Sequence, residues 1–290
     1  MSYVPIDLRG AALALLASLF WGVNPVALKI GLEDAPPLRL ASIRFLIGGI
    51  VILGWAWISG RLVGLRIARE EWRPLIVLGL TLTAQIASMN IATTMTSAAH
   101  VAIILNLYAV HFVVLAHFLI PGDRLSLRRL CGVLIAYGGI ALLFGREAGG
   151  APTLVGDGIM FLSALLLAER TIYMARAVQT FDPVKILLAQ AVIGGMLLFL
   201  MSLLFEPAAT RWTTRLAGSI AFQGVIVAGF NFIVNLWLLK RYRPTALATF
   251  FLTQPLFGVV AAALFTGDAL TLDLLIASAA VAAGIGLTSR

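Results

Sequence analysis

Ionisable side chains inside apolar segments are the residues of this sequence whose chemistry is most informative. Glu169, Tyr173 and Arg176 follow one another at i, i+4 and i+7 in the apolar run 154–178, so a helix would present them on one face. The neighbouring Arg170 would point about 100° away and reach the surface or pair elsewhere. Glu169 is therefore a candidate for proton coupling or gating, with a structural ion pair to an arginine as the alternative.

A second group of charges lies where two apolar runs adjoin. Lys29, Glu33, Asp34, Arg39 and Arg44 fall at the end of one run and the beginning of the next. They could form a gate of ion pairs or a network that stabilises the rim of a helical bundle. Lys29 and Arg44 are the candidates for gating, and Arg44 is the deepest of the five, so we expect it to have an internal partner.

The three histidines all lie in the run 98–120. On a helix His100 and His111 would be about 16 Å apart along the axis, so they could not share a metal ion. The sequence offers no other cluster of metal ligands, and we predict neither a metal nor a cofactor. Tyr108 and His111 would lie near mid-depth, where they could hydrogen-bond an amino or carboxyl group of a solute or pack between helices.

Prolines follow polar side chains in two further apolar runs. Pro25 follows Asn24 and Pro255 follows Gln254, and each proline removes a backbone hydrogen bond and can kink a helix. Kinked helices can expose carbonyl groups and line a cavity. We predict a pocket with aromatic walls and a few neutral polar groups, suited to an amphipathic solute, although such side chains also serve packing. The candidate substrate-binding residues are Trp21, Asn24, Tyr108, His111, Tyr173, Asn231, Asn235, Phe250, Gln254 and Phe257.

The elements that carry these residues must be helices that cross a membrane. Of the 290 residues 61% are hydrophobic and 12% charged, whereas soluble domains average roughly half apolar and about a quarter charged. This composition excludes a soluble enzyme, a disordered regulator and a nucleic-acid-binding module. Because lipid offers no partner for open backbone groups, the spans must be helical. We predict an all-α polytopic membrane protein with ten transmembrane helices near residues 10–30, 38–59, 74–93, 98–120, 128–145, 154–178, 184–205, 215–238, 244–266 and 270–288.

Basic residues predict how the chain is oriented. Most of the 21 lysines and arginines fall in short loops on the side of the N terminus, and few fall on the opposite side. Cytoplasmic loops carry such an excess, so we expect both termini in the cytoplasm. The net charge of +8 then reflects topology, and we predict the lipid bilayer rather than nucleic acid as a partner.

The chain also contains traces of a duplication. The segment Gly122–Leu127 (GDRLSL) recurs as Gly267–Leu272 (GDALTL), at an offset of 145 residues. At an offset of 146 the residues Pro37, Gly48 and Gly49 match Pro183, Gly194 and Gly195. Chance similarity among abundant residues is the alternative.

Two halves, 1–145 and 146–290, would each hold five helices. Because five is odd, the second half would enter the membrane from the opposite face. Inverted repeats of this kind are typical of secondary transporters, which hold their substrate near mid-depth where the halves meet. The duplication therefore predicts alternating access.

Several motifs together resemble one family. The segment 21–29 (WGVNPVALK) resembles the first-helix signature of EamA-type carriers in the drug/metabolite transporter superfamily. Arg44 resembles the arginine of their second helix, and Pro255 with the turn 267–270 resembles the end of their ninth. Asp123 and Asp268 replace a commoner Glu, and Val110 lies near where the family often has Pro.

The resemblance covers the whole chain, which looks most like the bacterial members that export aromatic amino acids. It implies ten helices in two five-helix halves, a bacterial-type inner membrane and outward transport. It also implies that the runs 128–145 and 270–288 buttress the carrier from outside the cavity.

The sequence thus predicts a secondary transporter of small amphipathic metabolites, with aromatic amino acids as the first candidates, and not an enzyme. Its partners would be a small-molecule substrate and the bilayer, and faces of small residues would allow a homodimer. The alternatives are a carrier of the same fold for a drug-like cation, a nucleobase or a sugar derivative, and a membrane enzyme or non-transporting scaffold. The chain has no Gly-Lys phosphate loop, no His-Glu-x-x-His and no Gly-x-Ser-x-Gly motif. Two modes of transport are compatible with the sequence, namely exchange against protons and facilitated flux down a gradient of the solute.

Overall fold

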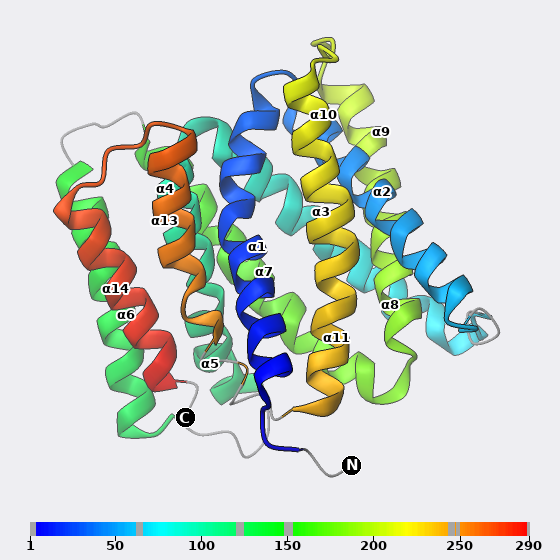
Figure 1. The fold of residues 1–290 in the computed structure, drawn as a ribbon, viewed down its shortest axis with the longest axis horizontal. Coiled ribbons are helices and arrows are strands. Elements are labelled where there is room, and N and C mark those ends of the chain that lie inside the picture. Colours follow the sequence, from blue (N-terminus) through cyan, green and yellow to red (C-terminus); the bar gives the residue numbers. More distant parts are fainter. Residues whose placement is uncertain are drawn as a thin grey trace.

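The computed structural model describes residues 4–61, 66–119, 125–147, 153–242, 247 and 250–288. Within these residues the chain is helical and forms no strand beyond one isolated bridge between Val4 and Tyr242. The helices stand side by side and run back and forth between two ends of a bundle (Figure 1). We call these the lower end, where α1 begins and α14 ends, and the upper end.

The first part of the bundle contains six α-helices. They are α1 (Leu8–Leu32), α2 (Pro37–Ile58), α3 (Trp72–Met95, preceded by the 3-10 turn η2, Arg69–Glu71), α4 (Ala98–Asn106), α5 (Tyr108–Leu119) and α6 (Leu127–Glu147). The second part contains α7 (Leu154–Thr180), α8 (Pro183–Ala189), the π-helix η3 (Gln190–Gly194), α9 (Gly195–Phe205), α10 (Thr214–Ala221), the π-helix η4 (Phe222–Asn231), α11 (Phe232–Arg241), α13 (Gln254–Phe265) and α14 (Leu272–Thr288).

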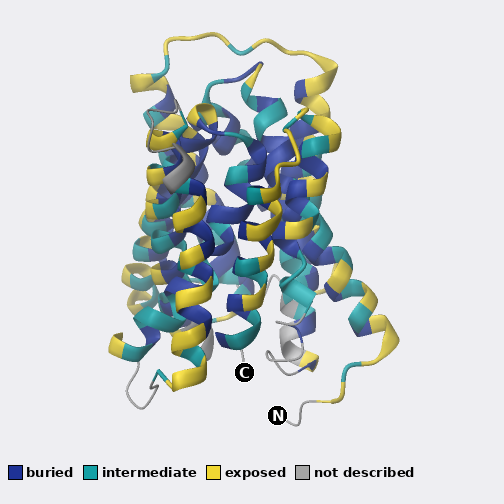
Figure 2. Ribbon diagram, turned by 90° about the vertical axis from the view of Figure 1, so that its left-hand side faces the viewer, coloured by how far each residue is buried: buried dark blue, intermediate teal, exposed yellow. Residues whose placement is uncertain are grey.

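Seven helical stretches of the described chain are long and apolar enough to cross a membrane, so the predicted class of an all-α polytopic membrane protein is confirmed. They are Leu8–Leu32, Pro37–Ile58, Arg69–Met95, Ala98–Leu119, Leu127–Phe144, Pro183–Phe205 and Thr214–Asn235. Large apolar side chains such as Trp57, Phe118 and Leu204 are exposed on the outside of the bundle. Exposed residues follow the outward faces of the helices while buried ones turn inward (Figure 2). Lipid is the medium that accommodates such a surface.

The helix boundaries follow from capping residues and prolines. Asp7 accepts a hydrogen bond from the Gly10 backbone (2.7 Å) and begins α1, and Asp182 does the same for α8. Pro37 and Pro183 each stand in the first turn of a helix, where a missing N–H costs nothing. The two predicted spans that begin here therefore start where the sequence places them.

The predicted spans 98–120 and 244–266 are each interrupted in the structure. The run 98–120 is divided at Leu107 into α4 and α5. α1 continues through Pro25 without interruption, whereas the chain makes a turn at 252–253 and α13 starts at Gln254. Pro255 thus lies in the first turn of a helix and does not kink one, since a residue without an N–H fits there. Most of residues 243–249 and the first copy of the Gly-Asp turn, 122–124, lie outside the described residues.

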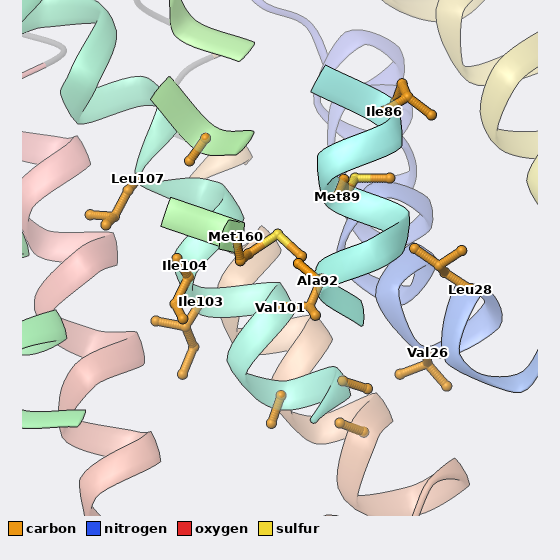
Figure 3. Close-up of a cluster of buried hydrophobic side chains, with 14 of the residues drawn as sticks. Val26, Leu28, Ile86, Met89, Ala92, Val101, Ile103, Ile104, Leu107 and Met160 are labelled. Atoms are coloured by element: carbon orange, nitrogen blue, oxygen red, sulfur yellow. The ribbon is translucent and has the colours of Figure 1, made fainter. Parts of the chain in front are cut away.

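The buried core joins helices from both parts of the chain. Val26 and Leu28 from α1 meet Ile86 and Met89 from α3, and Met160 of α7 packs beside them (Figure 3). These side chains are nearly or completely buried. α3 packs extensively against α7, and α1 packs against α13 and η4. The core therefore lies between the two parts rather than within either one.

Glycines permit the closest approaches between the two parts. A Cβ on Gly48 of α2 would lie 2.6 Å from the Cβ of Ala228 in η4, and Gly194 of η3 lies just as tightly against Leu82 of α3. Gly194 follows Gly48, and Ala228 follows Leu82, by the same number of residues. One close contact between a glycine and a neighbouring helix is therefore found twice, at positions related by one offset in the sequence.

α6 and α14 form a separate pair along one side of the bundle (Figure 1). A Cβ on Gly132 would lie 2.8 Å from the carbonyl oxygen of Gly284, and one on Gly139 would lie 2.7 Å from the Cβ of Ala280. Gly132, Gly139, Ala280 and Gly284 are thus used for packing within the chain. These four residues are therefore not available to the predicted homodimer.

Candidate functional site

The structure reverses the expected positions of Glu169 and Arg170. Glu169 is exposed on the outside of α7, whereas only 8% of Arg170 is exposed. Ser163, which lies seven residues before Arg170 and therefore on the same face of α7, is fully buried, and this packing turns Arg170 inward. Since neighbouring helical residues point about 100° apart, Glu169 turns outward. The prediction that Glu169 faces the interior is wrong, and the geometric basis for its role in coupling is lost.

Arg44 is buried between α2 and η4. Only 4% of it is exposed, and its Cζ lies 4.8 Å from the ring centroid of Phe45. Its Nη1 donates to Oε1 of Gln223 at 2.9 Å. The Nε2 of Gln223 in turn donates to Oγ of Ser219 (2.8 Å) and to the carbonyl of Ala27 in α1 (3.3 Å). Arg44 has the internal partner that its depth suggested, and that partner is neutral.

Arg170 has a matching arrangement in α7. Its Nη1 donates to Oε1 of Gln190 at 3.1 Å, and Gln190, like Gln223, lies in a π-helical segment. The segment that carries Gln190 packs against α2 around Arg44, because the Oγ of Ser42 donates to the Gly195 carbonyl at 2.9 Å and a Cβ on Gly49 would lie 3.2 Å from the Cβ of Ala191. Arg170, which is bonded to Gln190, is thus brought near Arg44, and the two positive charges repel each other. The Nε of each is buried without a hydrogen-bond partner. No carboxylate of the described residues pairs with Arg44 or Arg170. We call these two arginines the arginine pair.

Several residues predicted to line the pocket come together where α1 meets α11 and α13. The ring of Trp21 contacts Phe232 and Phe251 edge-on, with centroids 6.2 and 5.5 Å apart. Gln254 and Phe257 press against Gly22, where a Cβ would lie 2.6 Å from the Gln254 carbonyl oxygen and 2.8 Å from the Phe257 Cβ.

Unused polar atoms belong to this part of the bundle as well. Asn24 Oδ1, Gln254 Nε2 and Asn235 Oδ1 are buried without hydrogen-bond partners. Phe250 lies half-buried in a cluster with Ala14, Ala17 and Val234. A buried amide group without a partner is costly, so these atoms could meet polar groups of a solute.

Other predicted contacts are committed to packing. Asn231 is fully buried; its Nδ2 donates to the Ala17 carbonyl of α1 at 3.0 Å, while its Oδ1 has no hydrogen-bond partner. Tyr173 is half-buried beside Leu75, Leu78 and Ile186. Asn231 therefore fastens η4 to α1, and Tyr173 belongs to a different cluster from Trp21.

Tyr108 and His111 both lie in α5, beyond the division at Leu107. His111 is 2% exposed and packs against Phe161 of α7 and Tyr137 of α6, with centroids 4.8 and 5.6 Å apart. Neither ring nitrogen makes a hydrogen bond within 3.5 Å. Tyr108 is half-buried against the main core. His111 thus lies beside α6 and α7, and Tyr108 precedes it by three residues on the same helix.

The charges at the upper rim form a network between the two parts of the chain. The carboxylate of Asp34 accepts from Thr213 (2.7 Å) and pairs with Arg211 (3.1 Å) and Arg215 (3.2 Å). The hydrogen bond from Thr213, aided by Arg215 and Arg211, holds the pKa of Asp34 below its usual value. In the same rim the guanidinium of Arg39 contacts Ser202 and the Glu206 backbone. These contacts agree with the alternative in which the charges form a network that stabilises the rim of the bundle.

Lys29 caps a neighbouring helix. Its Nζ donates to the carbonyls of Thr93 (2.9 Å) and Thr96 (2.5 Å), at the C-terminal end of α3. A cation is favoured there because the last carbonyls of a helix have no partners within it. The structure thus gives Lys29 a capping position.

The buried carboxylate of Asp157 is a polar feature that sequence reasoning missed. Asp157 is fully buried in the first turn of α7; its Oδ2 lies 2.7 Å from Nδ1 of His100, and its Oδ1 accepts a hydrogen bond from Thr96. Nearby, Asp268 accepts from the Ala99 backbone at the start of α4 (2.9 Å). The signal was present, because Asp157 stands in the same apolar run as Glu169. Within the described residues no group of three potential ligands could hold a metal ion.

The bundle and its enclosed polar side chains define a multi-pass membrane protein. The sequence profile of the EamA-like transporter family matches this chain twice, over residues 8–145 and 154–290. The chain belongs to the EamA-like transporter family, and the resemblance seen in the segment 21–29 is confirmed.

Relatives agree with this assignment. The uncharacterized transporter YvbV of Bacillus subtilis (strain 168) is 27% identical over 92% of this chain and 87% of its own length. A probable amino-acid metabolite efflux pump of Escherichia coli (strain K12) is 27% identical over 91% of this chain and 89% of its own. A solved crystal structure superposes with a TM-score of 0.69 at 22% identity, covering 96% of this chain and 95% of that one, which shows a shared fold.

Proposed function

We propose that this transporter exports amino acids or closely related amphipathic metabolites, aromatic ones foremost, by alternating access. The support for an amino-acid substrate is the relative that is named a probable amino-acid metabolite efflux pump. The support for an aromatic side chain is the edge-on contact of Trp21 with Phe232 and Phe251. The proposed setting is a bacterial-type inner membrane, crossed ten times, with both termini in the cytoplasm.

The mechanism follows from treating the two halves as inverted repeats. The observation that carries it is the recurrence of equivalent contacts at an offset of 146. Gln85 of α3 exchanges hydrogen bonds with Ser163 of α7, and the equivalent positions, Asn231 and Ala17, are also hydrogen-bonded. If the halves rock about these equivalent contacts, a site between them opens alternately to each side.

The proposed pocket retains the side chains beside α1 that have unused polar atoms. Asn24, Gln254 and Asn235 would meet the polar end of the solute, and Trp21 with Phe257 would pack against its side chain. His111 and Tyr108 stay in the proposal as contacts on the side of α5. Asn231 and Tyr173 are assigned to the support of the pocket.

Transport by the purified protein tests this proposal. In proteoliposomes containing this protein alone, labelled phenylalanine should show saturable flux that other aromatic amino acids inhibit. Trp21→Ala should lower this flux, whereas Trp57→Ala, which removes a tryptophan exposed on the outside of α2, should leave it unchanged. Flux in the presence and absence of a pH gradient distinguishes proton exchange from facilitated transport. Absence of saturable flux above empty liposomes would refute amino-acid transport.

The alternative substrates of the same fold are drug-like cations, nucleobases and sugar derivatives. The arginine pair argues against cations, because it places two positive charges inside the bundle and no carboxylate of the described residues pairs with either of them. A neutral nucleobase or sugar derivative would leave these charges uncompensated. An anionic group suits them better.

A further inference from the structure

The arginine pair is a feature that packing alone does not explain, although Arg44 by itself resembles the arginine of the second helix in the family. Arg44 comes from α2 and Arg170 from α7, so the two proposed halves contribute one arginine each. Both are more than nine-tenths buried. Each is tethered at Nη1 by a glutamine oxygen, at 2.9 Å for Arg44 and 3.1 Å for Arg170. Two helices that are far apart in sequence therefore bring two guanidinium groups together inside the bundle.

The tethers do not neutralise this charge. A guanidinium removed from water needs an opposite charge or a full set of acceptors, and here each has one neutral amide oxygen through its Nη1. The Nε of Arg44 and the Nε of Arg170 have no acceptor at all. The two charges also repel each other. The arginine pair thus holds unused donors and a positive charge that no carboxylate of the described residues compensates.

We propose that Arg44 and Arg170 bind the carboxylate of the transported solute between the two halves. An ionised carboxylate has two oxygens that accept several hydrogen bonds, and arginine is the side chain best suited to it. One carboxylate could accept from both arginines and remove their repulsion. The binding of cationic solutes at this place would increase that repulsion, so the site selects for an anionic group.

The arrangement also connects binding with the transport cycle. Since the arginines belong to different halves, repulsion opposes their approach when the site is empty, and a bound carboxylate allows it. A ligand shifts a conformational equilibrium by its difference in affinity between two states, and a carboxylate shared by both arginines supplies that difference. Gln190 and Gln223 hold the guanidinium groups in place from π-helical segments, which are frequent at functional sites.

The first test compares two ligands that differ only in the carboxylate. This inference rests on the proposed amino-acid transport, so binding is measured with phenylalanine and with phenylalaninamide, whose carboxamide is uncharged. Arg170→Gln and Arg44→Gln should weaken phenylalanine binding by roughly 10- to 100-fold, because a charge-assisted hydrogen bond is lost. Binding of phenylalaninamide should not weaken, because this ligand carries no carboxylate for the arginines to bind. The matched control is Arg176→Gln, which removes an exposed arginine of α7 and should affect neither ligand.

The second test separates ligand binding from a structural role. Removing an uncompensated buried charge relieves a cost, so Arg170→Gln should raise the Tm of the empty protein while it abolishes the rise in Tm caused by phenylalanine. A purely structural arginine would lower the Tm of the empty protein when it is replaced. Arg170→Lys, which keeps the charge, should retain part of the stabilisation by phenylalanine.

Benzoate distinguishes failure of this inference from failure of the proposed function. It is an aromatic monocarboxylate without the amino group. The wild type could fail to bind or transport phenylalanine and yet be stabilised by benzoate, with this stabilisation lost in Arg170→Gln. That result would support the carboxylate site and refute amino-acid transport. If the glutamine variants weaken phenylalanine and phenylalaninamide equally, or if neither phenylalanine nor benzoate depends on the arginine pair, the inference is overturned.

Discussion

The contact of Gly48 with Ala228 makes a sharp test of how α2 packs on η4. In Gly48→Ala the new Cβ would lie 2.6 Å from the Cβ of Ala228 and 3.1 Å from its carbonyl carbon. Carbon atoms pack best at about 3.5–4.0 Å, so the methyl group is about 1 Å too close. Neither atom of Ala228 can rotate away, since one is a Cβ and the other belongs to the backbone. The two helices must therefore separate.

Overpacking of this kind costs about 1–3 kcal/mol. In a chain of this size each kcal/mol corresponds to a fall in Tm of about 2–4 °C. Thermal unfolding of the purified protein in detergent, followed by intrinsic fluorescence, should show this decrease. Because α2 carries Arg44 and η4 carries Gln223, the separation should also weaken phenylalanine binding.

Gly138 provides the matched control on α6. A Cβ at Gly138 would meet no atom within 4 Å. Replacing a helical glycine with alanine there should be neutral or stabilise the protein by about 0.5–1 kcal/mol, because alanine loses less conformational entropy on folding. If Gly48→Ala and Gly138→Ala have the same Tm, the close contact between α2 and η4 does not exist as described, and the helix positions that place Arg44 beside Gln223 are wrong.

Three further predictions concern charged groups. Asp157→Asn should lower the free energy of unfolding by about 1.5–3 kcal/mol, because it weakens buried hydrogen bonds to a carboxylate. Glu169→Gln, at an exposed position of the same helix, should change the free energy of unfolding by less than about 0.5 kcal/mol. Equal effects of the two variants in thermal unfolding would contradict the assigned faces of α7. Lys29→Met should lower the free energy of unfolding by about 1–3 kcal/mol, because it leaves carbonyls at the end of α3 without a donor. The dependence of flux on a pH gradient should not change in this variant. A changed dependence would show that Lys29 takes part in gating. The pKa of Asp34 is lower in the folded state, so its contribution to stability is complete above its unfolded pKa of about 3.9 and is lost as the pH falls through the lower folded value. The Tm difference between wild type and Asp34→Asn should thus be largest at neutral pH and shrink in strong acid, and a difference that grows in acid would show the opposite shift.

The sequence sufficed to predict helices that cross a membrane, because apolar runs of sufficient length between charged loops have one physical solution in lipid. The positions of Pro37 and Pro183 marked two helix starts correctly, since a proline fits the first turn and little else of a helix. The division at Leu107 and the two π-helical segments have no such marker. They depend on packing between neighbouring helices, which a single sequence does not display.

The orientation of Glu169 and Arg170 was beyond reach for a related reason. In a soluble helix a polar face indicates which side is exposed, but α7 is apolar nearly all round and presents no such face. Charge alone then placed Glu169 inside, on the rule that ionisable residues in spans face the interior. The rule holds for Arg170 and Asp157, which are buried. It could not decide between two adjacent ionisable residues of opposite charge.

The asymmetry between the halves explains how a duplicated chain could acquire one anion site. At the offset that equates Pro37 with Pro183, the position equivalent to Arg44 is Gln190, and this glutamine accepts the hydrogen bond from Arg170. An arginine at 190 would add a third positive charge and remove the acceptor that holds Arg170. A glutamine there instead fixes Arg170 in place and leaves its Nε unused. The two halves thus approach each other at equivalent positions, and the glutamine at position 190 allows two arginines, rather than three, to share one carboxylate.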